Sequence, residues 1–458
     1  MASRLRSLVL GRNLAGVLIR AVLGSAGVRL LGMAATFLVG VQLARALGPD
    51  GFGVYGTVMA IVLLLAVPAQ LALPQLLTRE LASSGTPAYR ARARASLTWF
   101  PLVVAVSSLT LTALCLAALA LWPWDLSDAI RRTLHWAVWL VPLTAFLNLG
   151  VAAIRGFHHV VSAQVYDALL RPALFAALLI VAGVLGATMR PERAIALQAL
   201  AAIVTLALLI VHAARIAPPD LIASKGKAEP GAWTAAALPM TGTEVLRVLD
   251  GQYPILLLGV IASLQEVGQF RVALAAAGFV GLPTTLITLV IMPHVAQFWA
   301  AQDKERMAKL AGGAALATFL SVLLMLIALV AVGRPLIGLL FGPDYLAAWP
   351  PLVLISTAFL ISAAFGAVAT ILNMSGEERT VTVAYAVSPV VGAGTTLLLY
   401  PGLGLSAAGV GLILSELLKG LILVRRAQRA LGVDPSILGA RHIFGHIAGG
   451  KPRKAAGE

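Results

Sequence analysis

The sequence predicts an all-α polytopic membrane protein of about twelve transmembrane helices, arranged as two similar six-helix lobes around a central cavity. Of its 458 residues, 60% are hydrophobic and only 12% are charged. Apolar runs of about 20 residues, the length that crosses roughly 30 Å of hydrocarbon, recur along the whole chain. Because lipid offers the backbone no hydrogen-bond partners, such runs must be helical. Glycines and prolines that return at a fixed distance indicate two halves.

The apolar runs define the individual helices. The spans that we expect are 16–44, 52–77, 96–121, 134–154, 163–188, 194–215, 236–262, 267–292, 311–333, 350–372, 380–400 and 404–424. The longest polar interruption, residues 217–235, contains several prolines and lysines and indicates a cytoplasmic linker. It separates an N-terminal lobe, residues 1–216, from a C-terminal lobe, residues 236–424. Residues 425–458 form a basic tail, which we expect near anionic lipid headgroups.

The first two helices meet at a sharp turn within the stretch LARALGPDGFGVY, which begins at Leu43. Gly48, Pro49 and Asp50 supply turn chemistry, since proline fixes one φ angle and glycine permits a positive one. Gly53 and Gly56 then open the second helix with small residues, which let a neighbouring helix approach closely in lipid. We therefore expect two tightly packed membrane helices here.

A similar pattern of glycine, aromatic residue and proline occurs again later in the chain. A shift of 215 positions places three residues of the second helix on chemically similar residues, namely Gly53 on Gly268, Tyr55 on Phe270 and Pro68 on Pro283. An internal duplication explains these matches, and such repeats build the two lobes of many transporters. The alternative is chance, because glycine and proline recur in any polytopic protein.

The distribution of lysine and arginine sets the orientation. If the N-terminus is cytoplasmic, 23 of these residues lie in the inside loops and termini. Six lie outside, namely Arg45, Arg131, Arg132, Arg190, Arg193 and Arg334. This positive-inside bias predicts that both termini are cytoplasmic. It also accounts for the net charge of +15 without nucleic-acid binding.

Several classes of site are absent from the sequence. Cys115 is the only cysteine, so no intramolecular disulfide forms. No CxxC spacing indicates a metal site, and no GxxxxGK[ST] motif indicates ATP use. No small-residue cleavage site follows a short apolar core, so we expect the first helix to stay. We expect no cofactor, and leave proton or sodium coupling open.

Four segments resemble the polysaccharide flippases of the multidrug/oligosaccharidyl-lipid/polysaccharide exporter superfamily. They are LARALGPDGFGVYGTVMA from Leu43, LPQLLTRELA from Leu73, VLDGQYPILLLGVIASLQEVGQFRVA from Val248 and LLFGPDYLAAWP from Leu339. The resemblance implies a non-enzymatic flippase of the bacterial inner membrane, working by alternating access through a cavity lined mainly by helices one, two, seven and eight. Its cargo would be an undecaprenyl-diphosphate-linked oligosaccharide for O-antigen, capsule or exopolysaccharide assembly.

Other functions stay open at this point. A lipid II flippase and a cation-coupled multidrug exporter belong to the same superfamily, although arginines in the cavity argue against cationic cargo. A membrane polysaccharide polymerase or ligase is the alternative from another class, and the short outer loops argue against it. The partners implied by the resemblance are the lipid-linked oligosaccharide, membrane lipids, a polysaccharide polymerase and a chain-length regulator.

Nine ionisable residues lie near the middle of predicted helices, where each costs roughly 2.5 to 3.5 kcal/mol on insertion scales and needs a partner, water or a function. They are Arg29, Asp167, Arg171, Glu244, Arg247, Asp250, Arg271, Glu416 and Lys419. Helical spacing allows ion pairs within single helices, for Asp167 with Arg171, for Arg247 with Glu244 and Asp250, and for Glu416 with Lys419. Mutual neutralisation is one interpretation of these pairs.

Arg29 and Arg271 have no acidic residue three or four positions away. Guanidinium groups bind phosphate oxygens in pairs, so Arg29, Arg247 and Arg271 are our candidates for binding the diphosphate. The alternatives are snorkelling for Arg271 and a salt bridge to another helix for Arg29. The shift of 215 relates Arg29 to Glu244, and we expect these two to pair in one access state. Asp250 is our candidate for ion coupling.

Overall fold

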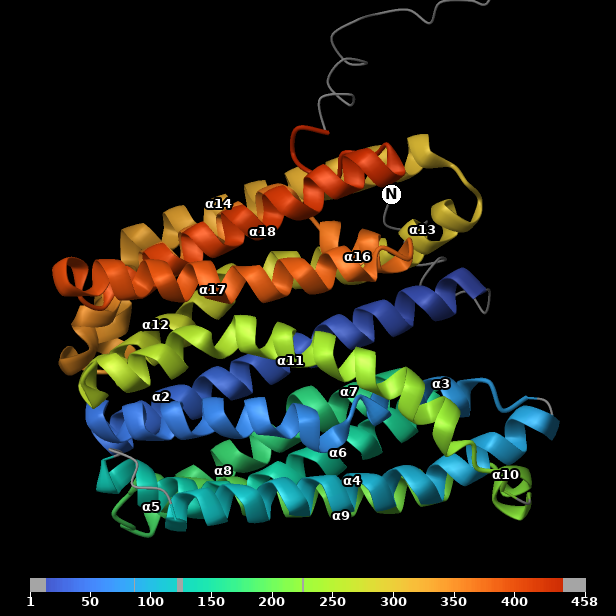
Figure 1. Cartoon of the computed structure of the whole chain (residues 1–458). Coiled ribbons are helices and arrows are strands. Elements are labelled where there is room, and N and C mark those ends of the chain that lie inside the picture. The colour runs from blue at the N-terminus through green and yellow to red at the C-terminus, as the bar shows by residue number, and fades with distance from the viewer. Residues whose placement is uncertain (1–13, 86, 122–126, 225, 440–458) are drawn as a thin grey trace, which may run out of the picture. The chain divides into compact units, whose positions relative to one another are not determined.

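The computed structural model describes residues 14–85, 87–121, 127–224 and 226–439, and within them all regular structure is helical (Figure 1). The predicted end of the basic tail and the N-terminal arginines Arg4, Arg6 and Arg12 lie outside these residues. The elements are α2 (Leu14–Gln70), α3 (Leu73–Ala82), α4 (Pro87–Leu121), α5 (Asp128–Ala137), α6 (Leu140–Gly156), α7 (Val160–Gln164), η1 (Val165–Leu170), α8 (Arg171–Val184), α9 (Pro191–Ile216), α10 (Pro219–Ala223), α11 (Pro230–Ile261), α12 (Leu264–Val280), α13 (Leu282–Ala300), α14 (Lys304–Leu340), η2 (Pro343–Ala348), α15 (Trp349–Phe365), α16 (Val368–Met374), α17 (Glu378–Leu403) and α18 (Ser406–Leu431).

The expectation of about twelve membrane helices is confirmed. Ten helical segments of the described chain are long and apolar enough to cross a membrane. The first of them, Gly24–Gln70, contains two helices joined at a kink. The 32-residue helix α11 is not among the ten, although its length suffices, and it completes the expected number. It carries Glu244, Arg247 and Asp250.

The kink between the first two helices lies at Gly48, within the predicted turn. Gly48 has φ 67° and ψ 175°, which is not a helical conformation. Its φ is positive, as glycine tolerates best. Pro49 starts the following helix, where its missing N–H costs no hydrogen bond. Gly51 keeps a helical backbone, so a single glycine makes the turn.

Packing divides the chain into two compact units. Unit 1 comprises Met1–Val272 and Gly338–Leu346, and unit 2 comprises Ala273–Ile337 and Ala347–Glu458. The sequence places the boundary between the two lobes at the linker 217–235, which lies within unit 1. The difference arises because α11 packs along α2, and because Gly268 of α12 lies against Gly53. Both contacts attach the start of the second half to the first.

The predicted linker is partly ordered as helix. Residues Pro219–Ala223 form α10, and α11 already begins at Pro230. Between these helices the backbone N–H of Lys227 donates to the carbonyl of Ala91 in α4, over 3.0 Å. The linker therefore follows the surface of unit 1 and is bound to it.

Each unit has its own core. In unit 1 every residue from 52 to 60 of α2 is buried, and α6 packs against both α4 and α9 (Figure 1). In unit 2 a cluster of α13, α14, α16, α17 and α18 forms around side chains such as Met307 and Leu372. Large apolar side chains on the outward faces, such as Leu121 and Val184, are more than four-fifths exposed, as lipid contact requires.

Three expected helices are interrupted. The expected span 267–292 breaks at Gly281 between α12 and α13, and the expected span 350–372 breaks at Gly366, which has φ 67°. The expected span 163–188 contains a π-helical segment, η1. Breaks of this kind in membrane helices need another source of backbone hydrogen bonds, and they often line polar sites.

Candidate functional site

The middle of α11 carries an ion pair on an exposed face. Arg247 donates from Nε to Oε2 of Glu244 over 2.8 Å, and its NH2 group lies 2.5 Å from the other carboxylate oxygen. The Arg247 side chain is 53% exposed. Because a charged group at this depth is too costly in acyl chains, this face of α11 must meet water or polar groups. Asp250, one turn further along, is buried.

Arg29 lies on α2, half-buried, and has no ion-pair partner among the residues that the structure describes. The pair that we expected with Glu244 is not formed here, because Glu244 binds Arg247 instead. A partner three residues away on the same helix is reached without any movement of the chain. Arg29 therefore keeps its donors available in this state.

The ion pair allowed by spacing between Asp167 and Arg171 is also not formed in the described chain. Asp167 lies in η1, and Arg171 follows it as the first residue of α8. A π-helix bonds residue i to i+5, so residues four apart no longer lie one above the other. Asp167 is exposed, and its neighbour Ala168 packs on α2, where a Cβ on Gly32 would lie 2.2 Å from the Ala168 carbonyl oxygen.

Arg271 is held by aromatic rings. Its Cζ lies 5.9 Å from the ring centroid of Phe52 and 5.6 Å from that of Tyr55, and the two rings are stacked. Gly56 leaves room for the arginine stem, since a Cβ there would lie 2.6 Å from Cδ of Arg271. The Tyr55 hydroxyl donates to Gln198 over 2.7 Å, which fixes its ring. Cation–π contacts thus join α12 to α2 without a carboxylate.

Unit 2 contains the remaining two candidates. Lys419 Nζ lies 2.5 Å from Oε1 of Glu416, so this pair forms as the spacing allows. The same ammonium lies 5.3 Å from the ring centroid of Tyr385. The pair lines a cavity of about 220 Å³ next to the helix break at Gly366, together with the hydroxyl-bearing residues Thr284, Thr288, Ser362 and Thr370. Sequence reasoning found the charges and missed the hydroxyls.

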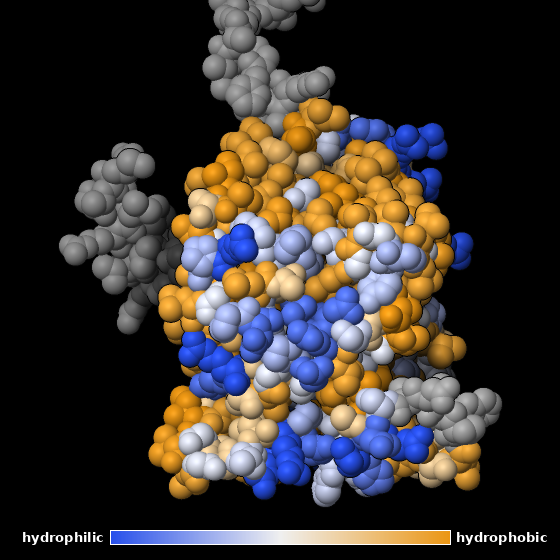
Figure 2. Space-filling model, turned by 90° about the vertical axis from the view of Figure 1, so that its left-hand side faces the viewer, coloured by the Kyte–Doolittle hydropathy of each residue, from blue (hydrophilic) through white to orange (hydrophobic). Residues whose placement is uncertain are grey.

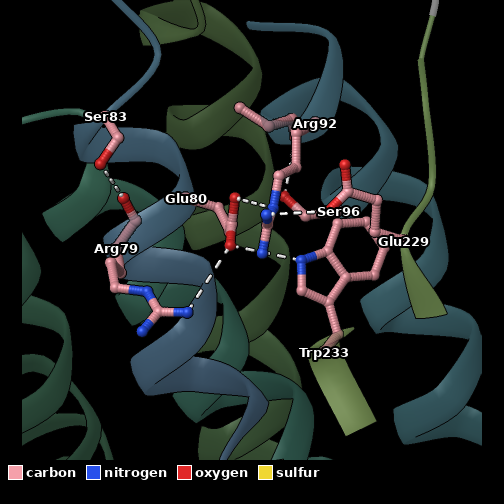
Figure 3. A network of polar contacts seen from close by, with 8 residues as sticks. Arg79, Glu80, Ser83, Arg92, Ser96, Glu229 and Trp233 are labelled. Carbon is pink, nitrogen blue, oxygen red and sulfur yellow. Dashed lines mark hydrogen bonds and ion pairs between the residues drawn. The ribbon is translucent and has the colours of Figure 1, made fainter. Parts of the chain in front are cut away.

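A buried carboxylate in unit 1 was also missed. Glu80 of α3 has a side chain only 5% exposed, and its oxygens are approached by Arg92 from α4 and by Trp233 from α11 (Figure 3). Arg92 Nε lies 2.8 Å from Oε2 of Glu80, and the Trp233 indole N–H donates to Oε1 over 3.3 Å. Arg92 also donates to Glu229 over 2.9 Å.

This cluster joins three segments that are far apart in sequence. Trp233 is fully buried and packs edge-on against Phe100, with ring centroids 4.9 Å apart. Glu229 and Trp233 belong to the stretch predicted as a linker, so the cluster anchors the entry of α11 to α3 and α4. The signal in the sequence was a lone acid directly after an arginine, in LPQLLTRELA.

Metal binding finds no support in these side chains. Across residues 14–439, apart from the short gaps, no group of three or more His, Cys, Asp or Glu side chains is arranged to hold a metal ion. Among the charged groups near mid-helix, Glu244 pairs with Arg247, Glu416 pairs with Lys419, and Arg271 meets aromatic rings. Such a set can bind an anion through arginine, or exchange one ion pair for another.

Comparison by sequence gives one family. The sequence model of a family described as polysaccharide biosynthesis protein matches residues 18–299. None of the curated proteins that were searched matches the chain significantly.

Comparison by structure finds solved transporters and a flippase whose fold is similar to that of this chain. A multidrug resistance transporter of the MATE family and MOP superfamily, in an inward-facing conformation, is 14% identical with a TM-score of 0.73, covering 89% of this chain and 98% of its own. The lipid II flippase MurJ is 10% identical with a TM-score of 0.68, covering 88% of this chain and 87% of its own. A MOP superfamily transporter from Pyrococcus furiosus, described as having a binding pocket of reversed polarity, is 12% identical with a TM-score of 0.63, covering 93% and 96%.

Proposed function

Because this chain belongs to the family of polysaccharide biosynthesis proteins and has the fold of the MOP superfamily transporters, we propose that it is a lipid-linked oligosaccharide flippase. It would move an undecaprenyl-diphosphate-linked oligosaccharide across the bacterial inner membrane by alternating access. The products would serve O-antigen, capsule or exopolysaccharide assembly. On this proposal the protein translocates its cargo without chemical change and is not an enzyme.

One observation carries the proposal most directly. The long helix α11 keeps Arg247 half-exposed at mid-span. Carrying a diphosphate through a low-dielectric region is expensive unless the path supplies compensating charge. Guanidinium remains protonated under all relevant conditions and can donate two parallel hydrogen bonds to phosphate oxygens.

In the proposed mechanism Glu244 holds Arg247 in place while no cargo is bound. The arriving diphosphate competes with the Glu244 carboxylate for the same donors, so binding needs little reorganisation. Arg29, which has no ion-pair partner in the described chain, supplies a second cation. Arg271 would not bind cargo directly, and its contacts with Phe52 and Tyr55 would hold α12 against α2. Asp250 would be the proton- or sodium-coupling carboxylate.

The cavity in unit 2 suits a different part of the cargo. Its threonine and serine hydroxyls, the Tyr385 ring and the Glu416–Lys419 pair provide donors, acceptors and an aromatic face. Sugars present the same combination of hydroxyls and apolar ring faces. We therefore propose that this cavity contacts sugars, and that Asp167 and Arg171 are secondary candidates for cargo contact.

Related cargo remains an alternative. The flippase MurJ, which shares the fold, carries lipid II, and the MATE transporters are described as multidrug transporters. Arginine in the path disfavours cationic drugs by like-charge repulsion, whereas it suits any prenyl diphosphate. A polymerase or ligase is disfavoured because the structural relatives are described as transporters and a flippase.

The proposed location follows from the charge bias. Both termini would lie in the cytoplasm of a bacterium, with the polysaccharide polymerase and the chain-length regulator as partners that receive the cargo on the outer side. Membrane lipids surround the chain, and neither a cofactor nor nucleic acid takes part.

The test is transport in reconstituted vesicles. A fluorescent undecaprenyl-diphosphate oligosaccharide is placed in one leaflet, and its arrival in the other is measured with a membrane-impermeant quencher. Wild type is compared with Arg247→Ala, with Arg29→Ala and with Arg379→Ala, an exposed arginine in the first turn of α17. Loss of a charge-assisted hydrogen bond predicts about tenfold to 100-fold slower flipping for the first two.

The outcomes separate the alternatives. Arg379→Ala should flip like wild type, which controls for the loss of one positive charge. Flipping of lipid II alone would assign the protein to the lipid II flippases. No transport of any prenyl-diphosphate sugar by correctly inserted wild type would refute the proposal.

A further inference from the structure

Four of the six arginines on the face predicted to lie outside the cytoplasm gather at one end of unit 1. Arg131 and Arg132 lie at the start of α5, and Arg190 and Arg193 lie at the start of α9. These helices are in contact, although some 60 residues separate the two arginine pairs. The positive-inside rule disfavours arginine in loops on the outer side of the membrane. Four such arginines close together therefore indicate a specific role, such as binding an anion.

Three of these arginines line one cavity. Arg132, Arg190 and Arg193 face a space of about 680 Å³, a volume within the range of small-molecule sites. Glu192 is the single acidic residue of the lining, and its carboxylate lies 3.8 Å from Arg132 Nε. Three guanidinium groups therefore face one carboxylate, and the cavity is cationic.

The three arginines are engaged to different degrees. Arg193 donates from NH1 to the carbonyl and to the hydroxyl of Thr188, over 2.7 and 3.0 Å. Arg132 has only the long contact with Glu192. The side chain of Arg190, the residue before α9, has no hydrogen-bond or ion-pair partner among the described residues. Two guanidinium groups thus retain donors for an anion.

The depth of the cavity in the membrane is indicated by tryptophan. Trp136 lines the cavity and is 60% exposed, and Trp139 follows one turn later, 49% exposed. Tryptophan collects at the membrane interface, at the level of the lipid headgroups. Figure 2 looks onto the side that carries α5, near the bottom left of Figure 1, and hydrophilic residues gather along the lower part of this face.

We propose that this cavity binds the phosphate headgroup of a lipid. Arg132 and Arg190 would bind the phosphate oxygens, Arg193 would add positive charge, and Trp136 would cover the apolar part of the lipid. Arginine clusters at headgroup depth attract anionic lipids, and a cavity adds a defined place for one molecule. The site is distinct from the charged groups of α11 and does not depend on the proposed transport.

The experiment measures lipid retention by the full-length protein. Wild type is purified in nanodiscs of phosphatidylcholine with a minor share of phosphatidylglycerol, released into the gas phase, and the bound lipids are counted by native mass spectrometry. The test variant is Arg132→Gln with Arg190→Gln. The matched control, Arg131→Gln with Arg334→Gln, removes the same charge from exposed outer positions that do not line the cavity.

We expect wild type and the control to retain one phosphatidylglycerol, and the test variant to bind it about 30-fold more weakly. Arg132→Lys with Arg190→Lys should keep most of the binding, because the charge remains. Equal retention by wild type, test variant and control would overturn the proposal. If the double variant fails to fold, Arg190→Gln alone serves, since the Arg190 side chain has no partner in the described chain to lose.

Two lipids could supply the phosphate, and a competition distinguishes them. Undecaprenyl diphosphate is added to the same nanodiscs at the concentration of phosphatidylglycerol. Its preferential retention by wild type would make the cavity a site for the diphosphate of a prenyl lipid. Preferential retention of phosphatidylglycerol would make it a site for bulk lipid. If the variant without Arg132 and Arg190 retains both lipids as well as wild type does, the site is refuted.

Discussion

Gly53 and Gly268 touch each other in a reciprocal way. A Cβ on Gly53 would lie 1.9 Å from the carbonyl oxygen of Leu264, and a Cβ on Gly268 would lie 2.0 Å from that of Pro49. Each oxygen belongs to the residue four positions before the opposite glycine, and both pairs are related by the shift of 215. The contact therefore has the symmetry of a two-fold interface, as expected when two copies of one helix meet.

This contact predicts that either glycine is intolerant of a side chain. Gly53→Ala or Gly268→Ala forces a methyl group into a backbone carbonyl, which should cost about 1–3 kcal/mol or more of unfolding free energy. The two variants should be affected alike because the contact is reciprocal. Thermal unfolding in detergent measures the loss, and Gly40→Ala on α2, where nothing lies within 4 Å, is the control. A neutral Gly268→Ala would contradict the arrangement.

Arg271 and Arg247 should respond differently to truncation. Arg271→Ala removes the cation–π contacts with Phe52 and Tyr55 and should lower stability by about 0.5–2 kcal/mol. Arg247→Ala, on an exposed face, should change stability by less than about 0.5 kcal/mol. Thermal melts of the two purified variants side by side check this. Equal losses would mean that Arg271 does not clamp α12 to α2.

Glu80→Gln should destabilise unit 1 more than Glu229→Gln. Glu80 is buried beneath Arg92 and Trp233, so its neutralisation leaves a partly buried guanidinium with one counter-charge fewer. We expect a loss of about 1–3 kcal/mol, below the 3–5 kcal/mol of a fully broken buried pair, because Arg92 keeps Glu229. Glu229 is 39% exposed and should contribute less than about 1 kcal/mol. Chemical unfolding ranks the two variants.

Arg29 and Glu244 should be energetically coupled if they pair in another access state. Arg29→Ala combined with Glu244→Ala should then flip cargo better than Arg29→Ala alone, because the double variant leaves no unpaired carboxylate. The initial flipping rates of wild type, both single variants and the double variant give the coupling energy by a double-mutant cycle. Strictly additive losses would show that the two residues act independently.

The ion pair between Glu377 and Arg426 predicts a pH dependence of stability. Arg426 donates to the Glu377 carboxylate over 3.0 and 2.8 Å, and these hydrogen bonds hold the pKa of Glu377 below its usual 4.5. A depressed carboxyl pKa stabilises the folded state above the unfolded-state value, and the gain is lost as pH falls through the folded-state value. Near neutral pH the melting temperature of wild type should therefore be higher than that of Glu377→Gln. The difference should vanish well below pH 4.5, and a constant difference would contradict the pair.

Hydropathy alone was sufficient to predict the helical membrane fold and the number of spans. Apolar length fixes these features because the bilayer has one thickness and accepts only a hydrogen-bonded backbone. The kink at Gly48 and the equivalence of Gly53 and Gly268 were also readable, since turn chemistry and repeats are local properties of the chain. The breaks at Gly281 and Gly366 were not, because a single glycine within an apolar run is compatible with a continuous helix.

Partnerships between charges were decided by the tertiary structure. Spacing treats Asp167 and Arg171 as it treats Glu244 and Arg247, yet only the second pair forms, because η1 shifts the helical register of the first. Arg271 finds aromatic rings on α2, and Glu80 is reached by side chains from α4 and α11, contacts that no local pattern encodes. Sequence determines which segments enter the membrane through the cost of exposing polar groups to lipid. Packing decides which groups meet, because those contacts depend on the relative placement of helices far apart in the chain.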